Sequence, residues 1–105
     1  TESFNIEANP EWAYLDANKV SFPMIVRSWQ AGDTFRPFGM KGQSKRVSDI
    51  LINKKLTLFE KEKVKVMIDA KRNILWLIGI RIDDRACITV ETQRVIVIKR
   101  RQKGR

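Results

Sequence analysis

The segment from Arg27 to Asp49 restricts the fold of this 105-residue chain more than any other, because turn-forming, aromatic and basic residues alternate along it. Glycine and proline interrupt regular backbone, so the segment cannot be one long helix or strand. Its turn-forming and aromatic residues are Trp29, Gly32, Phe35, Pro37, Phe38, Gly39 and Gly42. We expect an irregular loop of fixed shape that presents cations to an anion. The alternative is a loop whose aromatic side chains anchor the core while its cations are merely solvated.

The net charge of +9 is concentrated in two places, the middle of the chain and its end. Residues 25–56 hold seven Lys and Arg against two Asp, and residues 99–105 add five more cations. By contrast, residues 1–24 hold four acidic residues and one Lys. A basic field of this kind suits a polyanion such as RNA. No amphipathic helix of the size needed to bind an acidic membrane surface is evident, so we predict no membrane partner.

Apolar runs and cysteine content indicate where the protein works. No run approaches the roughly 18 apolar residues that cross a bilayer, and the first residues lack the charged and apolar regions of a signal peptide. Cys87 has no partner for an internal disulfide, which fits a reducing compartment. We therefore expect a cytoplasmic protein. Because the chain does not begin with Met, we expect a piece of a longer protein, and we expect the basic tail at residues 100–105 to be mobile.

The residue types that are missing exclude several classes of catalyst. The chain has no histidine, which excludes histidine-based acid–base catalysis, histidine metal ligation and a Ser-His-Asp triad. One cysteine is too few for a cysteine-rich zinc site. The stretch Gly39–Gly42 is too short for a phosphate loop and lacks the Gly-Lys-Ser/Thr ending. The carboxylates of Asp83 and Asp84 are expected to pair with the flanking Arg81 and Arg85. We predict no catalytic residue, no metal site and no cofactor in this piece.

The hydrophobic pattern predicts six or seven strands. Pro23 indicates an edge strand or a break before the strand that follows it. The apolar run Ile74–Ile78 indicates a central strand, with Trp76 in the core. The predicted strands cover residues 4–8, 12–16, 24–29, 64–69, 74–78, 80–82 and 94–98.

Two short helices are predicted in the middle of the chain, which makes the fold class α+β. Ser44 is the expected N-cap of the first helix. Its apolar stripe and its C-terminal cations are Val47, Ile50, Leu51, Lys54 and Lys55. Thr57 and Glu60 fit a capping box, which predicts a second helix that runs to about Lys63.

The order and spacing of three motifs resemble one known family. They are Gly32-Asp33-x-Phe35-x-Pro37-x-Gly39-Met40-Lys41-Gly42, then Lys45-x-Val47-Ser48-Asp49-Ile50-Leu51-Ile52, and Ile74-x-Trp76-x-x-Gly79-x-Arg81-Ile82-Asp83-Asp84-Arg85 followed by Thr89 and Thr92. Together they resemble the C-terminal domain of tRNA(Ile)-lysidine synthetase. The resemblance covers about residues 24–99, which we take as the core of a single domain spanning residues 1–105.

The resemblance implies a β-rich, sandwich-like α+β domain, similar to a domain of the phenylalanyl-tRNA synthetase β subunit. It also implies a parent enzyme that uses ATP, with magnesium, to attach lysine to the wobble cytidine of a minor isoleucine tRNA. That chemistry belongs to an N-terminal catalytic domain with a Ser-Gly-Gly-x-Asp-Ser loop, which this chain lacks. The implied partners are therefore the tRNA, through its acceptor stem, and the catalytic domain of the same parent chain.

We predict that basic residues of the central segment contact tRNA phosphates. The predicted contacts are Arg27, Arg36, Lys41, Lys45, Arg46, Lys54 and Lys55. Arg81 and Arg85 are ranked lower as tRNA contacts, because Asp83 and Asp84 are expected to neutralise both. For each cation the alternative is a solvated or structural role.

Two other functions remain open at this stage. The domain could be a protein-interaction module that packs on the parent chain or on a second subunit, including a homodimer. An apolar surface patch bordering Phe35 and Phe38 would favour that role. A free-standing small RNA-binding protein is the third alternative.

Overall fold

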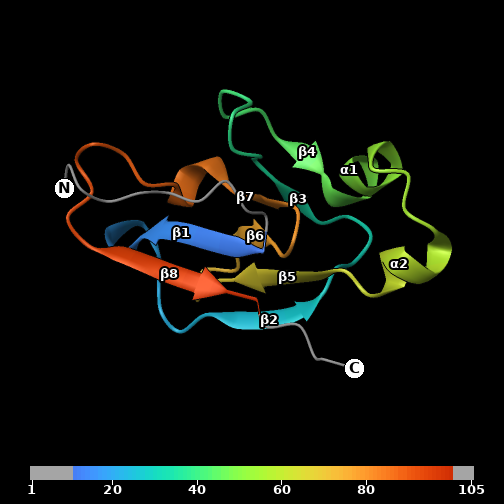
Figure 1. Cartoon of the computed structure of the whole chain (residues 1–105), viewed down its shortest axis with the longest axis horizontal. Coiled ribbons are helices and arrows are strands. Elements are labelled where there is room, and N and C mark those ends of the chain that lie inside the picture. Colours follow the sequence, from blue (N-terminus) through green and yellow to red (C-terminus); the bar gives the residue numbers. More distant parts are fainter. Residues whose placement is uncertain (1–10, 101–105) are drawn as a thin grey trace.

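A four-stranded antiparallel sheet forms the middle of the fold (Figure 1). The computed structural model describes residues 11–100. The strands lie in the order β2-β5-β6-β7, and every neighbouring pair is antiparallel. Their bounds are Ile25–Ser28 for β2, Lys65–Ile68 for β5, Ile74–Leu77 for β6 and Arg81–Ile82 for β7.

Two smaller antiparallel sheets and two helices surround this sheet. Strand β1 (Trp12–Asp16) pairs with β8 (Val95–Lys99), and β3 (Thr34–Phe35) pairs with β4 (Lys45–Arg46). Helices α1 (Val47–Asn53) and α2 (Leu58–Glu62) follow β4 directly. Short 3-10 turns η1 and η2 cover Ala17–Lys19 and Asp84–Ala86.

Strand β6 separates two hydrophobic clusters, which explains its apolar residues on both faces. All four of its residues are buried, and the exposed fraction of Trp76 is 1%. The first cluster joins Ile74 and Leu77 to β3, β5 and α1, whereas the second joins Leu75 and Trp76 to β1 and Ala86. The sheet is therefore the middle of three layers, which confirms the predicted sandwich-like α+β fold.

A β-bulge in β6 places two successive side chains on one face. The pairing register shifts between Met67, opposite Trp76, and Ile68, opposite Ile74. Leu75 is the extra residue, and an extra residue breaks the strict alternation of side chains. Leu75 therefore packs with Trp76 in the second cluster rather than on the opposite face. On the β7 side of β6, the carbonyl of Leu75 accepts a hydrogen bond from the backbone N–H of Asp83, at 2.8 Å, next to the pairing of Trp76 with Ile82.

The predicted start of the first helix at Ser44 is wrong. Lys45 and Arg46 form β4, opposite Phe35 and Thr34, so the helix begins only at Val47. No side chain caps this end; instead the backbone N–H of Val47 donates to the carbonyl of Asp33, at 2.9 Å. The strand pairing thus supplies the partner that a side-chain N-cap provides elsewhere.

The second helix confirms the predicted capping box. The backbone N–H of Glu60 donates to the hydroxyl of Thr57, and the Thr57 N–H donates to the Glu60 carboxylate, at 3.1 and 2.9 Å. The helix ends at Glu62 with Lys63 as its C-cap, within one residue of the predicted end at about Lys63.

The strands differ from the prediction mainly in the segment expected to be a loop. Eight strands occur in residues 11–100, because β3 and β4, each two residues long, pair inside that segment. The predicted strand at residues 4–8 lies outside the described residues. Strand β2 is an edge strand, as Pro23 indicated. Strand β8 forms as predicted, with Ile96 and Ile98 packed on the second cluster and Val97 44% exposed.

Of the predicted basic tail, the structure describes Arg100. Its backbone N–H donates to the carbonyl of Glu11 at 2.8 Å, and its guanidinium forms an ion pair with the Glu11 carboxylate. The same guanidinium lies over Gly79, where an added Cβ would come within 3.0 Å of it. Residues 101–105 lie outside the described part of the chain. No helix within residues 11–100 is long and apolar enough to cross a membrane.

The carboxylate of Asp83 ties the β3–β4 segment to the sheet. Asp83 is 1% exposed and accepts four hydrogen bonds: one from the backbone N–H of Arg36, and three from the backbone, Nε and Nη2 of Arg85. Around it, the Phe38 N–H donates to the carbonyl of Ile82 and the Asp84 N–H donates to the carbonyl of Arg36. A buried carboxylate is tolerated only when its oxygens are satisfied in this way.

We predict that Asp83→Asn lowers the free energy of unfolding by about 3 kcal/mol, measured by urea denaturation. The amide removes the charge that Arg85 faces and turns one acceptor into a donor that meets other donors. Asp84→Asn is the matched control and should cost less than about 0.5 kcal/mol, because Asp84 is only half-buried. Equal costs for the two variants would show that the Asp83 bonds do not hold the fold.

Candidate nucleic-acid interface

The loop between β3 and β4 projects beyond the sheet and is fixed at its base (Figure 1). Its tip turns through Gly39, Lys41 and Gly42, whose φ angles are +91°, +56° and +80°. The backbone N–H of Met40 donates to the carbonyl of Pro37, and that of Gln43 to the carbonyl of Met40. Successive turns of this kind hold an irregular backbone in one shape, as the sequence predicts.

The aromatic residues of this segment have different roles. Phe35 is 1% exposed and belongs to the first cluster, and Trp29 packs against that cluster with its Nε1–H donating to the carbonyl of Lys61 at 2.7 Å. Phe38, by contrast, is 50% exposed. Two of the three aromatics therefore anchor the loop, while the third lies at its surface.

Arg27 differs from the other predicted contacts because a carboxylate neutralises it. Its Nη1 and Nη2 donate to the two carboxylate oxygens of Asp33, each at 3.0 Å, and the hydrogen bond with Asp33 raises the pKa of Arg27. Burial alone would raise the pKa of Asp33, but the bonds from Arg27 and from the Gln30 N–H outweigh it and lower that pKa. The pair closes the turn between β2 and β3.

The other six predicted cations form no ion pair within residues 11–100. Arg36, Lys41, Arg46, Lys54 and Lys55 are exposed, and Lys45 is half-buried. They come from the β3–β4 loop, from β4 and from the C-terminal end of α1. Strand β2, which carries Arg27, lies at the edge of the sheet opposite β7. The structure leaves these six side chains free for an anion, and their contacts with tRNA remain a prediction.

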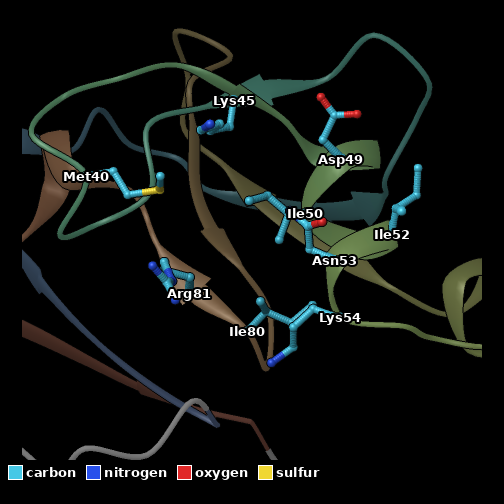
Figure 2. A pocket seen from close by; sticks show the side chains of 9 residues that line it. All are labelled: Met40, Lys45, Asp49, Ile50, Ile52, Asn53, Lys54, Ile80 and Arg81. Atoms are coloured by element: carbon cyan, nitrogen blue, oxygen red, sulfur yellow. The ribbon is translucent and has the colours of Figure 1, made fainter.

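A groove of about 520 Å³ lies between α1 and the β6–β7 turn. Figure 2 shows Met40, Lys45, Ile50 and Arg81 around a common opening, with Ile80 and the amine of Lys54 along its lower side. The groove brings together two predicted contacts, Lys45 and Lys54, and adds Arg81.

Arg81 was expected to be neutralised, and within residues 11–100 it is not. Arg85 alone pairs with Asp83, through Nε and Nη2 at 3.0 and 3.1 Å, and this bond raises the pKa of Arg85. Arg81 is exposed, and among the described residues its one hydrogen-bond acceptor is the carbonyl of Phe38, at 3.4 Å. The reason is local: Asp83 caps η2, which brings a residue two positions later back to its carboxylate. The sequence signal for this pair was an aspartate at the start of a turn, followed two positions later by an arginine.

Comparison with known proteins gives close relatives over most of the chain. The tRNA(Ile)-lysidine synthases of Parabacteroides distasonis and Bacteroides thetaiotaomicron are 41% identical over 98 residues and 44% identical over 99 residues. These alignments cover 93% and 94% of this chain but 22% and 23% of the relatives. The chain thus spans about a fifth of the length of the curated relatives it matches. No protein-family model matches the chain.

Two solved structures share the fold. The crystal structure of a TILS C-terminal domain matches with a TM-score of 0.77 and 26% identity, over 92% of this chain and 74% of that chain. An N-terminal fragment of the phenylalanyl-tRNA synthetase β-subunit from Pyrococcus horikoshii matches with a TM-score of 0.70 over 82% of this chain and 26% of that chain. At 19% identity, the second likeness shows the fold alone.

The layered sheets and the two short helices therefore define a β-rich α+β domain of the type seen in the phenylalanyl-tRNA synthetase β-subunit fragment. Within that class, the chain belongs to the family of tRNA(Ile)-lysidine synthetase C-terminal domains. The resemblance carried by the sequence motifs is confirmed.

We predict that Asp33→Asn weakens the dependence of stability on acid pH. Because the pKa of Asp33 is lowered in the folded state, the wild-type pair stabilises the fold above the unfolded-state pKa. That contribution is lost as pH falls through the folded-state pKa. Urea unfolding between about pH 5 and pH 2 should show a smaller loss of stability for Asp33→Asn than for wild type. Asp49→Asn, at an exposed position, is the control, and its stability should depend on pH as that of wild type does. A wild-type dependence of stability on pH for Asp33→Asn would contradict a stabilising role of the Arg27–Asp33 pair.

Proposed function

We propose that this domain binds the substrate tRNA of a tRNA(Ile)-lysidine synthetase. The observation that supports this role is the set of six basic side chains without ion pairs in residues 11–100, held on the β3–β4 loop, β4 and the end of α1. Lysine and arginine side chains that are free of carboxylates can each approach a phosphate of the RNA backbone. Among polyanions, the similarity to curated tRNA(Ile)-lysidine synthases favours tRNA as the ligand.

The complete enzyme would be an ATP-dependent ligase of tRNA processing in the cytoplasm, which attaches lysine to the wobble cytidine of a minor isoleucine tRNA. In this proposal, ATP, magnesium and lysine bind to an N-terminal catalytic domain of the same parent chain. The present domain binds the tRNA body at its acceptor stem. This contact positions the anticodon at the catalytic domain. A double-stranded stem is read mainly through its shape and backbone, so cations on a fixed loop suit this task.

A second candidate function, contact with another protein surface, is supported by the exposed side chains of the two helices. Leu58 and Phe59 on α2 are 74% and 65% exposed, and Ile52 on α1 is 59% exposed. The catalytic domain of the parent chain, or a second copy in a homodimer, would cover them in this case. The patch predicted around Phe35 and Phe38 is not the source of this surface, because Phe35 is buried in the core.

We predict that the chain binds tRNA with a strong dependence on salt. Contact with about five phosphates gives a slope of log affinity against log salt of roughly −3.5 to −4.5. Fluorescence anisotropy with labelled isoleucine tRNA at several potassium chloride concentrations measures this slope. Replacing Lys41, Lys45 and Arg46 together by Gln should make the slope shallower by about 2–3 units, since three counterion-releasing contacts are lost.

Lys71→Gln combined with Arg94→Gln provides the matched control, because both cations are exposed and lie outside the β3–β4 loop and the helices. This control should keep the wild-type slope, and circular dichroism should show that all variants are folded. A slope near zero for wild type would reject the proposed RNA grip. Equal losses in the triple variant and the control would show that charge alone, not this surface, drives binding.

A further inference from the structure

Binding the backbone of an RNA duplex does not require a concave site such as the groove beside α1. Its volume of about 520 Å³ falls within the range of pockets that enclose small ligands. Its walls come from three elements, because Lys45 lies on β4, Ile50 on α1 and Arg81 on β7 (Figure 2). Cations that only follow phosphates along a stem could lie on a convex surface.

The floor of the groove is apolar and firmly held. Ile50 and Ile80 line it, and both are partly buried and packed against the first hydrophobic cluster. Met40, from the loop tip, contributes a third apolar side chain that can adapt its shape. An apolar floor offers nothing to a phosphate, but it suits the flat face of an unstacked base or the carbon edge of a ribose.

The rim of the groove is basic. Lys45, Lys54 and Arg81 line it, and within residues 11–100 none of them forms an ion pair. Asp49 is its carboxylate, and Figure 2 shows this side chain directed away from Ile80, Lys54 and Arg81. The side-chain amide of Asn53 adds a donor and an acceptor, the groups that read the edge of a base.

We propose that this groove binds one unpaired nucleotide of the RNA, with the base on the apolar floor and the adjoining phosphates against the three cations. The proposal rests on the RNA-binding function inferred above and adds the class of ligand for this site. In a duplex the base faces are stacked and paired, so only a single-stranded segment next to the stem can supply such a nucleotide.

The test compares two hairpin RNAs that share the same stem, one blunt and one with a short unpaired extension. Affinity for each is measured by fluorescence anisotropy with the wild-type chain. The extension should strengthen binding about tenfold, at the low end of the gain that stacking a base on an aromatic side chain gives, because the groove floor is aliphatic. Met40→Ala, which changes the floor, and Arg81→Gln, which changes the rim, should reduce that gain to about twofold or less while preserving most of the affinity for the blunt hairpin.

Lys41→Gln is the matched control, because Lys41 is an exposed loop cation that does not line the groove. It should weaken binding of both hairpins equally and leave the tenfold gain intact. Salt-dependent binding with equal affinity for both hairpins would overturn the nucleotide site while leaving the proposed RNA-binding function in place. If neither hairpin nor tRNA binds, both proposals fail. A gain that survives in Met40→Ala and Arg81→Gln would place the unpaired nucleotide elsewhere and also overturn this inference.

Discussion

The buried carboxylate of Asp83 is the interaction on which the rest of this domain depends. Asp83 joins three parts of the chain. Its carboxylate accepts from the Arg36 N–H of the β3–β4 segment and from Arg85 of the η2 turn, and its backbone N–H donates to the carbonyl of Leu75 in β6. Each connection is a hydrogen bond to backbone or to a guanidinium, so none tolerates a change of donor or acceptor. The irregular loop thereby acquires the rigidity of the sheet.

This rigidity links the core to the surface that we assign to RNA. The first hydrophobic cluster contains Phe35, which directly precedes Arg36, Val47, which directly follows Arg46, and Leu51 of α1. Packing of these side chains fixes β4 and α1, and the positions of Lys45 and Lys54 follow from that packing. The cations are thus presented at set distances from one another, which lowers the entropy lost when they order around a bound polyanion.

Much of the fold follows from local sequence patterns. The run Ile74–Ile78 predicted a central strand, and the capping box of Thr57 and Glu60 predicted α2, because both patterns act over a few residues. The start of α1 could not be predicted in this way. Its first N–H group is satisfied by the carbonyl of Asp33, a partner 14 positions earlier in the numbering that only the β3–β4 pairing brings near. Ser44 had the right chemistry for a cap but lies before that pairing.

The candidate site shows the same division between local and long-range information. Sequence composition identified the basic segment, and six of its seven selected cations lack ion pairs in the described residues. Arg81 was ranked by the carboxylates near it in sequence and Arg27 was selected as a cation of the basic segment, whereas the pairs are decided in space. Asp33 turns back onto Arg27, and Asp83 is used by Arg85, which leaves Arg81 beside the groove. Arg81 and Arg85 are each two positions from Asp83, so the geometry of the turn, and not proximity along the chain alone, decides which of them forms the pair.

The tip of the β3–β4 loop has a consequence for how such a domain can change. Gly39 and Gly42 face open space, with no atom near the position of an added Cβ. The bonds to the Asp83 network lie at the base of the loop, whereas the tip is held by its own backbone turns. Residues can therefore be inserted, or charges exchanged, between these two positions without disturbing the Asp83 network. The tip is consequently the natural point of variation in this scaffold, where a lineage could adjust its grip or an experimenter could attach a reporter group while the body of the protein stays unaltered.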